Sequence, residues 1–203
     1  MTTTTTRQST FPIEPQFLQR WSPRAFDRTP LACTTLMSLF EAARWAPSAY
    51  NVQPWRFVYS LRDDSNWFKF LDLLDPFNAQ WAKDAGALVF LISSKVVPGI
   101  QPEKPFPSHS FDAGSAWIQL ALQAVAMGYQ AHAMGGIFRD KIRKTLGIPG
   151  EFQIEIGIAI GRPGDAHLLP EHLKSREAPS DRVPLQDLIF EGKFGSSRRS
   201  LQI

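Results

Sequence analysis

The stretch EAARWAPSAYNVQPWRF, residues 41–57, joins a predicted helix to a predicted strand through a segment that cannot be regular. The helix is predicted over residues 34–46, where apolar side chains occupy the i, i+3, i+4 and i+7 positions of one buried helix face. Pro47 ends that helix, and the polar segment up to the next proline suits neither helix nor strand. The aromatic residues that follow alternate with other types, which predicts a strand over residues 55–60.

Working outward, three segments carry the strongest further signals. Residues 87–93 are continuously apolar, which predicts a central strand covered on both faces. Residues 112–127 form the clearest helix, apolar nearly all round and ended by Gly128. Residues 152–160 alternate large apolar with smaller residues, as a strand does. Shorter elements are predicted as helices at 65–74, 138–146 and 184–190, a strand at 130–134 and a proline-rich loop at 97–110.

The order of these elements mixes helices and strands without a regular βαβ rhythm. It therefore predicts an α+β fold, with helices packed around a mainly antiparallel or mixed sheet. With 203 residues, 43% of them hydrophobic, the chain is expected to form one domain over residues 17–195. Residues 1–16, which include a run of threonines, are expected to be disordered, and 196–203 to form a tail.

Composition argues against several classes of protein. The longest apolar run has eight residues, 85–92, whereas a membrane-spanning helix needs about 20. No secretory signal is visible, and the single cysteine, Cys33, leaves no intrachain disulfide, so a cytoplasmic protein is expected. The net charge of +3 is spread along the chain, which argues against a nucleic-acid binder. The four histidines lack the spacing of a metal site.

Two basic clusters are candidates for binding a phosphate. Arg20, Ser22 and Arg24 place two guanidiniums and a hydroxyl within five residues, and arginine offers bidentate donors to phosphate. Lys174 and Arg176 form a second cluster, and the two together could clamp one phosphate from both ends of the chain. An exposed basic turn would also explain either cluster.

Other residues suit a flat heterocyclic ligand. In Met134-Gly135-Gly136, the adjacent glycines let the backbone approach a planar group and present N–H donors to it. Asn51 and Asn78 could each donate to and accept from a heterocycle edge. A plain turn would account for these residues equally well. No Gly-x-Gly-x-x-Gly fingerprint or P-loop is present.

Taken together, these motifs resemble those of the FMN-dependent nitroreductase family, in order and rough spacing, from about residue 17 to 195. The long central motif at 41–57 is specific, and the short ones are weak alone. The motifs are Arg20-Trp21-Ser22-Pro23-Arg24, residues 41–57, Asp112-Ala113-Gly114, Met134-Gly135-Gly136, residues 160–165 and Leu173-Lys174-Ser175-Arg176.

The resemblance implies an intertwined homodimer with one FMN in each of two interface sites, and residues 112–127 would be the central dimer helix. It implies that Arg20, Ser22 and Arg24 hold the FMN phosphate and ribityl chain, with backbone contacts from Trp21. Lys174 and Arg176 would form the second phosphate-binding pair, with Arg162 as a helper. The remaining implied contacts to the flavin ring come from Pro47, Ser48, Ala49 and Asn51 of the partner subunit, Asn78 at the pyrimidine edge, and Met134, Gly135 and Gly136, one N–H pointing at N5.

Two residues depart from the family pattern. Gly135 stands where many members have glutamate, so a carboxylate near the flavin is missing. Trp81 stands where some members have lysine near the ring, and losing that cation would disfavour an anionic reduced flavin. These departures leave the redox potential and the preferred acceptor open.

The implied reaction is ping-pong. NADH or NADPH passes hydride to flavin N5, leaves, and is replaced by an electron-poor acceptor such as a nitroaromatic compound or a quinone. The cofactor carries the chemistry, so no catalytic side chain is expected. Phe106 and Phe111 are hypothesised to line the acceptor side, with core or loop packing as the alternative. A dehalogenating, heterocycle-oxidising or flavin-cleaving enzyme on the same scaffold, and a non-enzymatic flavin sensor, remain alternatives.

Overall fold

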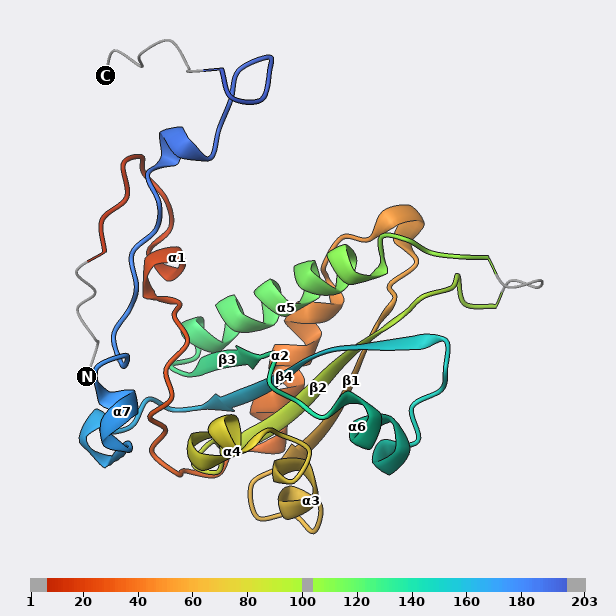
Figure 1. Cartoon of the computed structure of the whole chain (residues 1–203), viewed down its shortest axis with the longest axis vertical. Coiled ribbons are helices and arrows are strands. Elements are labelled where there is room, and N and C mark those ends of the chain that lie inside the picture. The colour runs from red at the N-terminus through yellow and green to blue at the C-terminus, as the bar shows by residue number, and fades with distance from the viewer. Residues whose placement is uncertain (1–6, 100–103, 197–203) are drawn as a thin grey trace.

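A computed structural model describes residues 7–99 and 104–196 (Figure 1). Its centre is a four-stranded sheet in the order β1-β2-β4-β3, and every neighbouring pair is antiparallel. The strands are β1 (Trp55–Leu61), β2 (Ala87–Ser94), β3 (Gln130–Met134) and β4 (Phe152–Gly161). This confirms the predicted α+β class and places each predicted strand within one residue of its observed end.

Two helices cover one face of the sheet. They are α2 (Cys33–Arg44) and α5 (His109–Ala126), which pack on each other and enclose a core cluster that includes Leu39, Leu120 and Ile158. Burial of both faces explains why β2 is apolar from Ala87 to Ile92. The predicted end of α5 is confirmed, because Gly128 follows the cap residue Met127 with a φ of +77°.

Shorter helices cover the opposite face. They are α3 (Trp67–Leu71), α4 (Pro76–Ala82), α6 (Arg139–Leu146) and α7 (Glu171–Lys174). The helix predicted over 65–74 is longer than the observed α3, and the helix predicted over 184–190 is a single turn, Leu185–Asp187. Helices α4 and α7 were not predicted. Asp75 caps α4 by accepting a hydrogen bond from the N–H of Asn78 at 2.7 Å, with Pro76 as its first residue.

The C-terminal arm, residues 178–196, rises away from the body of the molecule alongside the N-terminal stretch (Figure 1). Both segments line a groove of about 480 Å³, and α1 (Pro15–Gln19) begins where the N-terminal stretch rejoins the body. Apolar side chains such as Phe17, Val183 and Leu188 are exposed along it. Of the expected disordered segment, residues 7–16 are among those described. Residues 1–6, and 197–203 of the expected tail, lie outside the described residues.

Candidate functional site

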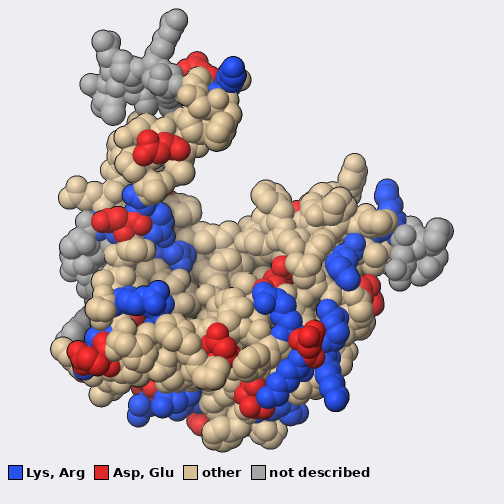
Figure 2. All heavy atoms as spheres, in the orientation of Figure 1, with Lys and Arg blue, Asp and Glu red and all other residues tan. Residues whose placement is uncertain are grey.

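A cavity of about 400 Å³ opens where residues 20–24, strand β3 and the root of the C-terminal arm meet. Figure 2 shows Lys and Arg side chains grouped where the arm joins the body. Five guanidiniums line the cavity, and among the described residues no carboxylate does. The lining residues are Arg7, Arg20, Trp21, Ser22, Arg24, His132, Arg176, Ala178, Ser180 and Arg182.

Four of the five arginines of this cavity form no ion pair among the described residues. They are Arg20, Arg24, Arg176 and Arg182. Burial, reinforced by the guanidiniums of Arg182 and Arg7, lowers the pKa of Arg20, and burial with Arg176 lowers that of Arg24. Nε of Arg24 is buried and has no hydrogen-bond partner among the described residues. Positive charge gathered in this way fits an anion the size of a phosphate.

The turn at residues 20–24 is held from three sides. The carboxylate of Glu177 accepts hydrogen bonds from the backbone N–H groups of Arg24 and Ala25, both at 2.8 Å. Gln130 accepts from the N–H of Trp21 at 3.4 Å and donates to the carbonyl of Gln19 at 3.2 Å. His132 Nδ1 lies 2.8 Å from the carbonyl oxygen of Pro23. The position of the turn is therefore fixed by the body of the protein.

The two basic residues predicted near the C-terminus are separated by the structure. Arg176 lines the cavity, whereas Lys174 donates to Glu171 at 2.8 Å and is not among the lining residues. Arg182 and Arg7 also line the cavity, although neither stood out in the sequence. Arg182 lies far from residues 20–24 along the chain, and Arg7 falls in the segment that was expected to be disordered. Arg162 lies elsewhere, its guanidinium 4.8 Å from the ring centre of Tyr129.

The glycine segment is anchored to the start of α4. Asn78 Nδ2 donates to the carbonyl of Gly136 at 3.1 Å, and the N–H of Asp75 donates to the same oxygen at 3.1 Å. A Cβ added to Gly136 would overlap the side chains of both residues, so only glycine fits there. Gly135 is exposed with open space around its Cα, and Met134 is buried.

The loop formed by Pro47, Ser48, Ala49 and Asn51 lies at the opposite end of α5 from the cavity. The N–H of Ala49 donates to Asp112 in the first turns of that helix, at 3.1 Å, and Ser48 Oγ accepts from the N–H of Gln53 at 2.9 Å. The 18 residues of α5 span about 27 Å. Within one chain, residues 47–51 therefore lie far from the arginine-lined cavity, although both were predicted to contact the same cofactor.

The backbone of the same loop is strained and faces outward. Tyr50, Asn51 and Gln53 have φ angles of 52°, 55° and 52°, in the left-handed region that non-glycine residues rarely occupy. The Tyr50 side chain is 98% exposed. Such strain gathers at binding sites and needs surroundings that maintain it.

The three aromatic residues singled out in the sequence lie in different environments. Trp81 is buried, with its ring centre 4.5 Å from that of His132, so the indole lies behind the cavity wall rather than facing it. Phe106 is also buried, which matches the packing alternative, whereas Phe111 is 81% exposed on α5. The structure thus leaves Phe111 as the accessible one of the proposed acceptor-side pair.

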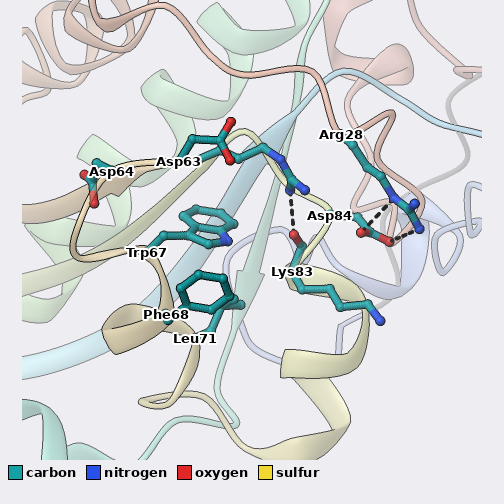
Figure 3. Close-up of a pocket in the computed structure, with 9 residues that line it drawn as sticks. Arg28, Asp63, Asp64, Trp67, Phe68, Leu71, Lys83 and Asp84 are labelled. Atoms are coloured by element: carbon teal, nitrogen blue, oxygen red, sulfur yellow. Dashed lines mark hydrogen bonds and ion pairs between the residues drawn. The ribbon is translucent and has the colours of Figure 1, made fainter.

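A second cavity, of about 570 Å³, lies by α3 and the end of α4 (Figure 3). It is lined by charges of both signs, and one pair of them is neutralised within the chain. Arg28 pairs with Asp84 at 2.9 Å, and Arg62 donates to the carbonyl of Lys83 at 2.6 Å. This mixed-charge pocket, defined by Arg28, Arg62, Asp63, Asp64, Trp67, Phe68, Leu71, Lys83 and Asp84, is a weaker candidate for a charged ligand.

Residues 7–99 and 104–196 contain neither a cluster of metal-ligating side chains nor a helix able to cross a membrane. No group of three or more His, Cys, Asp or Glu residues there could hold a metal ion. No helix there has the length and apolar character needed to cross a membrane.

Comparison with known proteins identifies relatives. The model of the nitroreductase family matches residues 17–66 and 62–162. A crystal structure described as an oxidoreductase containing FMN is 50% identical, with a TM-score of 0.93 over 97% of this chain and 100% of that one. An NADH dehydrogenase of Thermus thermophilus is 25% identical over 85% of this chain and 92% of its own. A protein of Exiguobacterium sibiricum, described as a nitroreductase and solved in complex with FMN, is 21% identical and shares the fold, with a TM-score of 0.72 over 91% and 99% of the two chains.

Proposed function

Because the chain belongs to the nitroreductase family, we propose that it is an FMN-dependent oxidoreductase whose arginine-lined cavity binds the cofactor phosphate. Its electron donor would be NADH or NADPH, and its acceptor a small electron-poor compound such as a nitroaromatic or a quinone. The observation that carries the proposal is the cavity lined by five arginines and, among its described lining residues, no carboxylate, whose charge a phosphate dianion would neutralise.

The residues present fit this cofactor. Ser22 adds a hydroxyl donor to the guanidiniums, and the unpartnered Nε of Arg24 would gain an acceptor from a phosphate oxygen. The N–H of Gly135 has no acceptor among the described residues, and its open surroundings suit a flat ring. Asn78 would act mainly by holding the Gly136 carbonyl, and so the backbone that faces the ring.

The proposal includes a homodimer, because the site is incomplete in one chain. The outer face of α5 exposes Phe111, Gly114 and Ile118 and leaves Leu122 and Val125 partly exposed. These residues recur at intervals of three and four, which makes a stripe able to pack on another helix. A second copy packed with its α5 antiparallel would bring its own residues 47–51 beside the cavity.

Bound FMN would supply the redox chemistry, taking up hydride from the nicotinamide and passing it on to the acceptor. The chain's own residues would bind and orient. The arginines and Ser22 hold the phosphate end, and the backbone of Gly135 faces the ring. Phe111 of the second copy, at the same end of α5 as residues 47–51, would border the space above the ring. The donor and the acceptor would occupy that space in turn.

The visible spectrum of the purified protein tests this function. We expect a yellow protein, or one that becomes yellow with added FMN, that bleaches when NADH or NADPH is added without oxygen. A colourless protein that fails to bind added FMN would contradict the proposal. A yellow protein that neither nicotinamide bleaches would instead favour a flavin-binding sensor.

A further inference from the structure

His132 occupies an unusual position between the core and the arginine-lined cavity. It lies on β3, where its backbone pairs with Ala159 of β4, and its ring packs at a tilt against the buried indole of Trp81, with 4.5 Å between ring centres. Its Nδ1 lies 2.8 Å from the carbonyl oxygen of Pro23. Because a carbonyl oxygen can only accept, Nδ1 carries the proton and donates it. The ring therefore links the rigid core to the turn that presents Ser22 and Arg24.

We propose that His132 is a positioning residue for the anion site, which holds the turn through Pro23 and takes up a proton when a phosphate group enters the cavity. The inference rests on the proposed function, in that the phosphate is taken to be that of FMN. The new element is that cofactor binding would be accompanied by proton uptake at His132, a residue that need not touch the flavin ring.

The charges around His132 explain the coupling. On its own side of the cavity it faces Arg20 and Arg24, and Arg7, Arg176 and Arg182 line the rest. The carboxylate of Glu177 is engaged by the N–H groups of Arg24 and Ala25, and Trp81 carries no charge. Burial, followed by repulsion from Arg24 and Arg20, lowers the pKa of His132 to about 4, so the ring is neutral in the empty site.

A phosphate in the cavity would counteract the positive charges that lower the pKa of His132. An anion within a few ångströms raises the pKa of a neighbouring histidine by about 1–3 units, which brings that of His132 to roughly 5–7. The complex then binds more protons than the free protein, so affinity for the anion rises as pH falls through this window. Above about pH 7 the ring is neutral in both states and the contribution vanishes. The phosphate's own ionisation near pH 6 acts in the opposite sense, so a reference variant is needed.

Two variants separate the two parts of the proposal. His132→Asn keeps an N–H donor near the position of Nδ1 but cannot titrate. His132→Phe keeps the ring on Trp81 but removes the donor. Calorimetric titration with FMN, in two buffers of different ionisation enthalpy, measures both the affinity and the number of protons taken up.

At about pH 5.5 we expect the wild type to take up about half a proton more than His132→Asn and to bind FMN about threefold more tightly. At about pH 8 these two proteins should agree in both quantities. His132→Phe should bind FMN about 3- to 10-fold more weakly than His132→Asn at both pH values, the loss expected for one hydrogen bond. Equal proton uptake by wild type and His132→Asn, or undiminished affinity of His132→Phe, would overturn the inference.

Inorganic phosphate serves as a second probe, so that failure of the inference and of the proposed function can be told apart. If the protein binds phosphate with the expected difference in proton uptake but does not bind FMN, the flavin function falls and the role of His132 stands. If FMN binds without the difference, the role of His132 alone falls. If neither probe binds, both are wrong.

Discussion

The two charged cavities of this molecule differ in a way that their volumes do not reveal. The mixed-charge pocket is the larger, at about 570 Å³ against 400 Å³, yet its Arg28 and Asp84 neutralise each other within the chain. The arginine-lined cavity gathers five guanidiniums without a carboxylate among its described lining residues. A cavity that has balanced its own charges gains little from a charged ligand, whereas one that has not is stabilised by an anion. Unbalanced charge, rather than size, therefore marks the candidate site.

The largest expected loss of FMN binding comes from preventing dimer formation. Only the arginine-lined cavity is proposed to be completed by residues of a second chain. Ile118→Arg places a charge in the exposed apolar stripe of α5. We expect a monomer in analytical ultracentrifugation that retains no FMN, because residues 47–51 of the partner are lost from the site. Phe68→Arg, at an exposed residue of the mixed-charge pocket, is the matched control and should leave both properties unchanged. A monomeric Ile118→Arg protein that keeps its FMN would contradict the shared site.

Replacing one arginine in each cavity should distinguish the two cavities by the change in FMN affinity. Arg20→Ala removes a charge-assisted contact of about 1.5–3 kcal/mol, so the affinity for FMN should fall about 10- to 100-fold. Arg28→Ala removes the same kind of side chain from the mixed-charge pocket and should change the affinity less than about twofold. Flavin fluorescence titration measures both. Equal losses would show that general surface charge, not the cavity, attracts the cofactor.

The C-terminal basic residues allow a finer comparison. Arg176→Ala and Arg182→Ala should each weaken FMN binding about tenfold, since both side chains line the cavity. Lys174→Ala should change it less than about twofold, because its ammonium is engaged with Glu171 on the surface. If Lys174→Ala had the largest effect of the three, the cavity would have to rearrange on binding to admit it.

The smallest expected effect is on the free energy of unfolding when the ion pair of the mixed-charge pocket is removed. The Arg28 side chain is 57% exposed, so its ion pair with Asp84 is screened by solvent. Arg28→Ala should lower the free energy of unfolding by less than about 1 kcal/mol, or a few degrees in Tm. Chemical denaturation measures this change. A loss several times larger would mean that this pocket is a structural centre of the fold.

Sequence reasoning captured the elements whose pattern is long and periodic. All four strands and α5 were predicted because continuous or alternating apolar residues reflect burial on the sheet. Helices α4 and α7 have seven and four residues, too few turns for helical spacing to be visible, although Asp75 and Pro76 are local start signals for α4.

The site was predictable where its residues are contiguous. Arg20, Ser22 and Arg24 were found together because one turn carries them all. Lys174 and Arg176 were treated as a pair, but residues two apart on a helical turn do not face the same side. Arg182 could be placed only by the packing of the arm, which no local pattern encodes. The assignments of the individual residues to FMN stay predictions.

The arginine-lined cavity is proposed to recognise the cofactor through its phosphate. Riboflavin has the same ring and ribityl chain as FMN without the phosphate, so the ratio of the two dissociation constants isolates that contact. We predict that the wild type binds FMN at least about 100-fold more tightly than riboflavin, and that the double variant Arg20→Ala, Arg24→Ala lowers this ratio by at least about tenfold, with Arg176 and Arg182 retaining the rest. A wild type without this preference, or a double variant that keeps the full ratio, would contradict the claim.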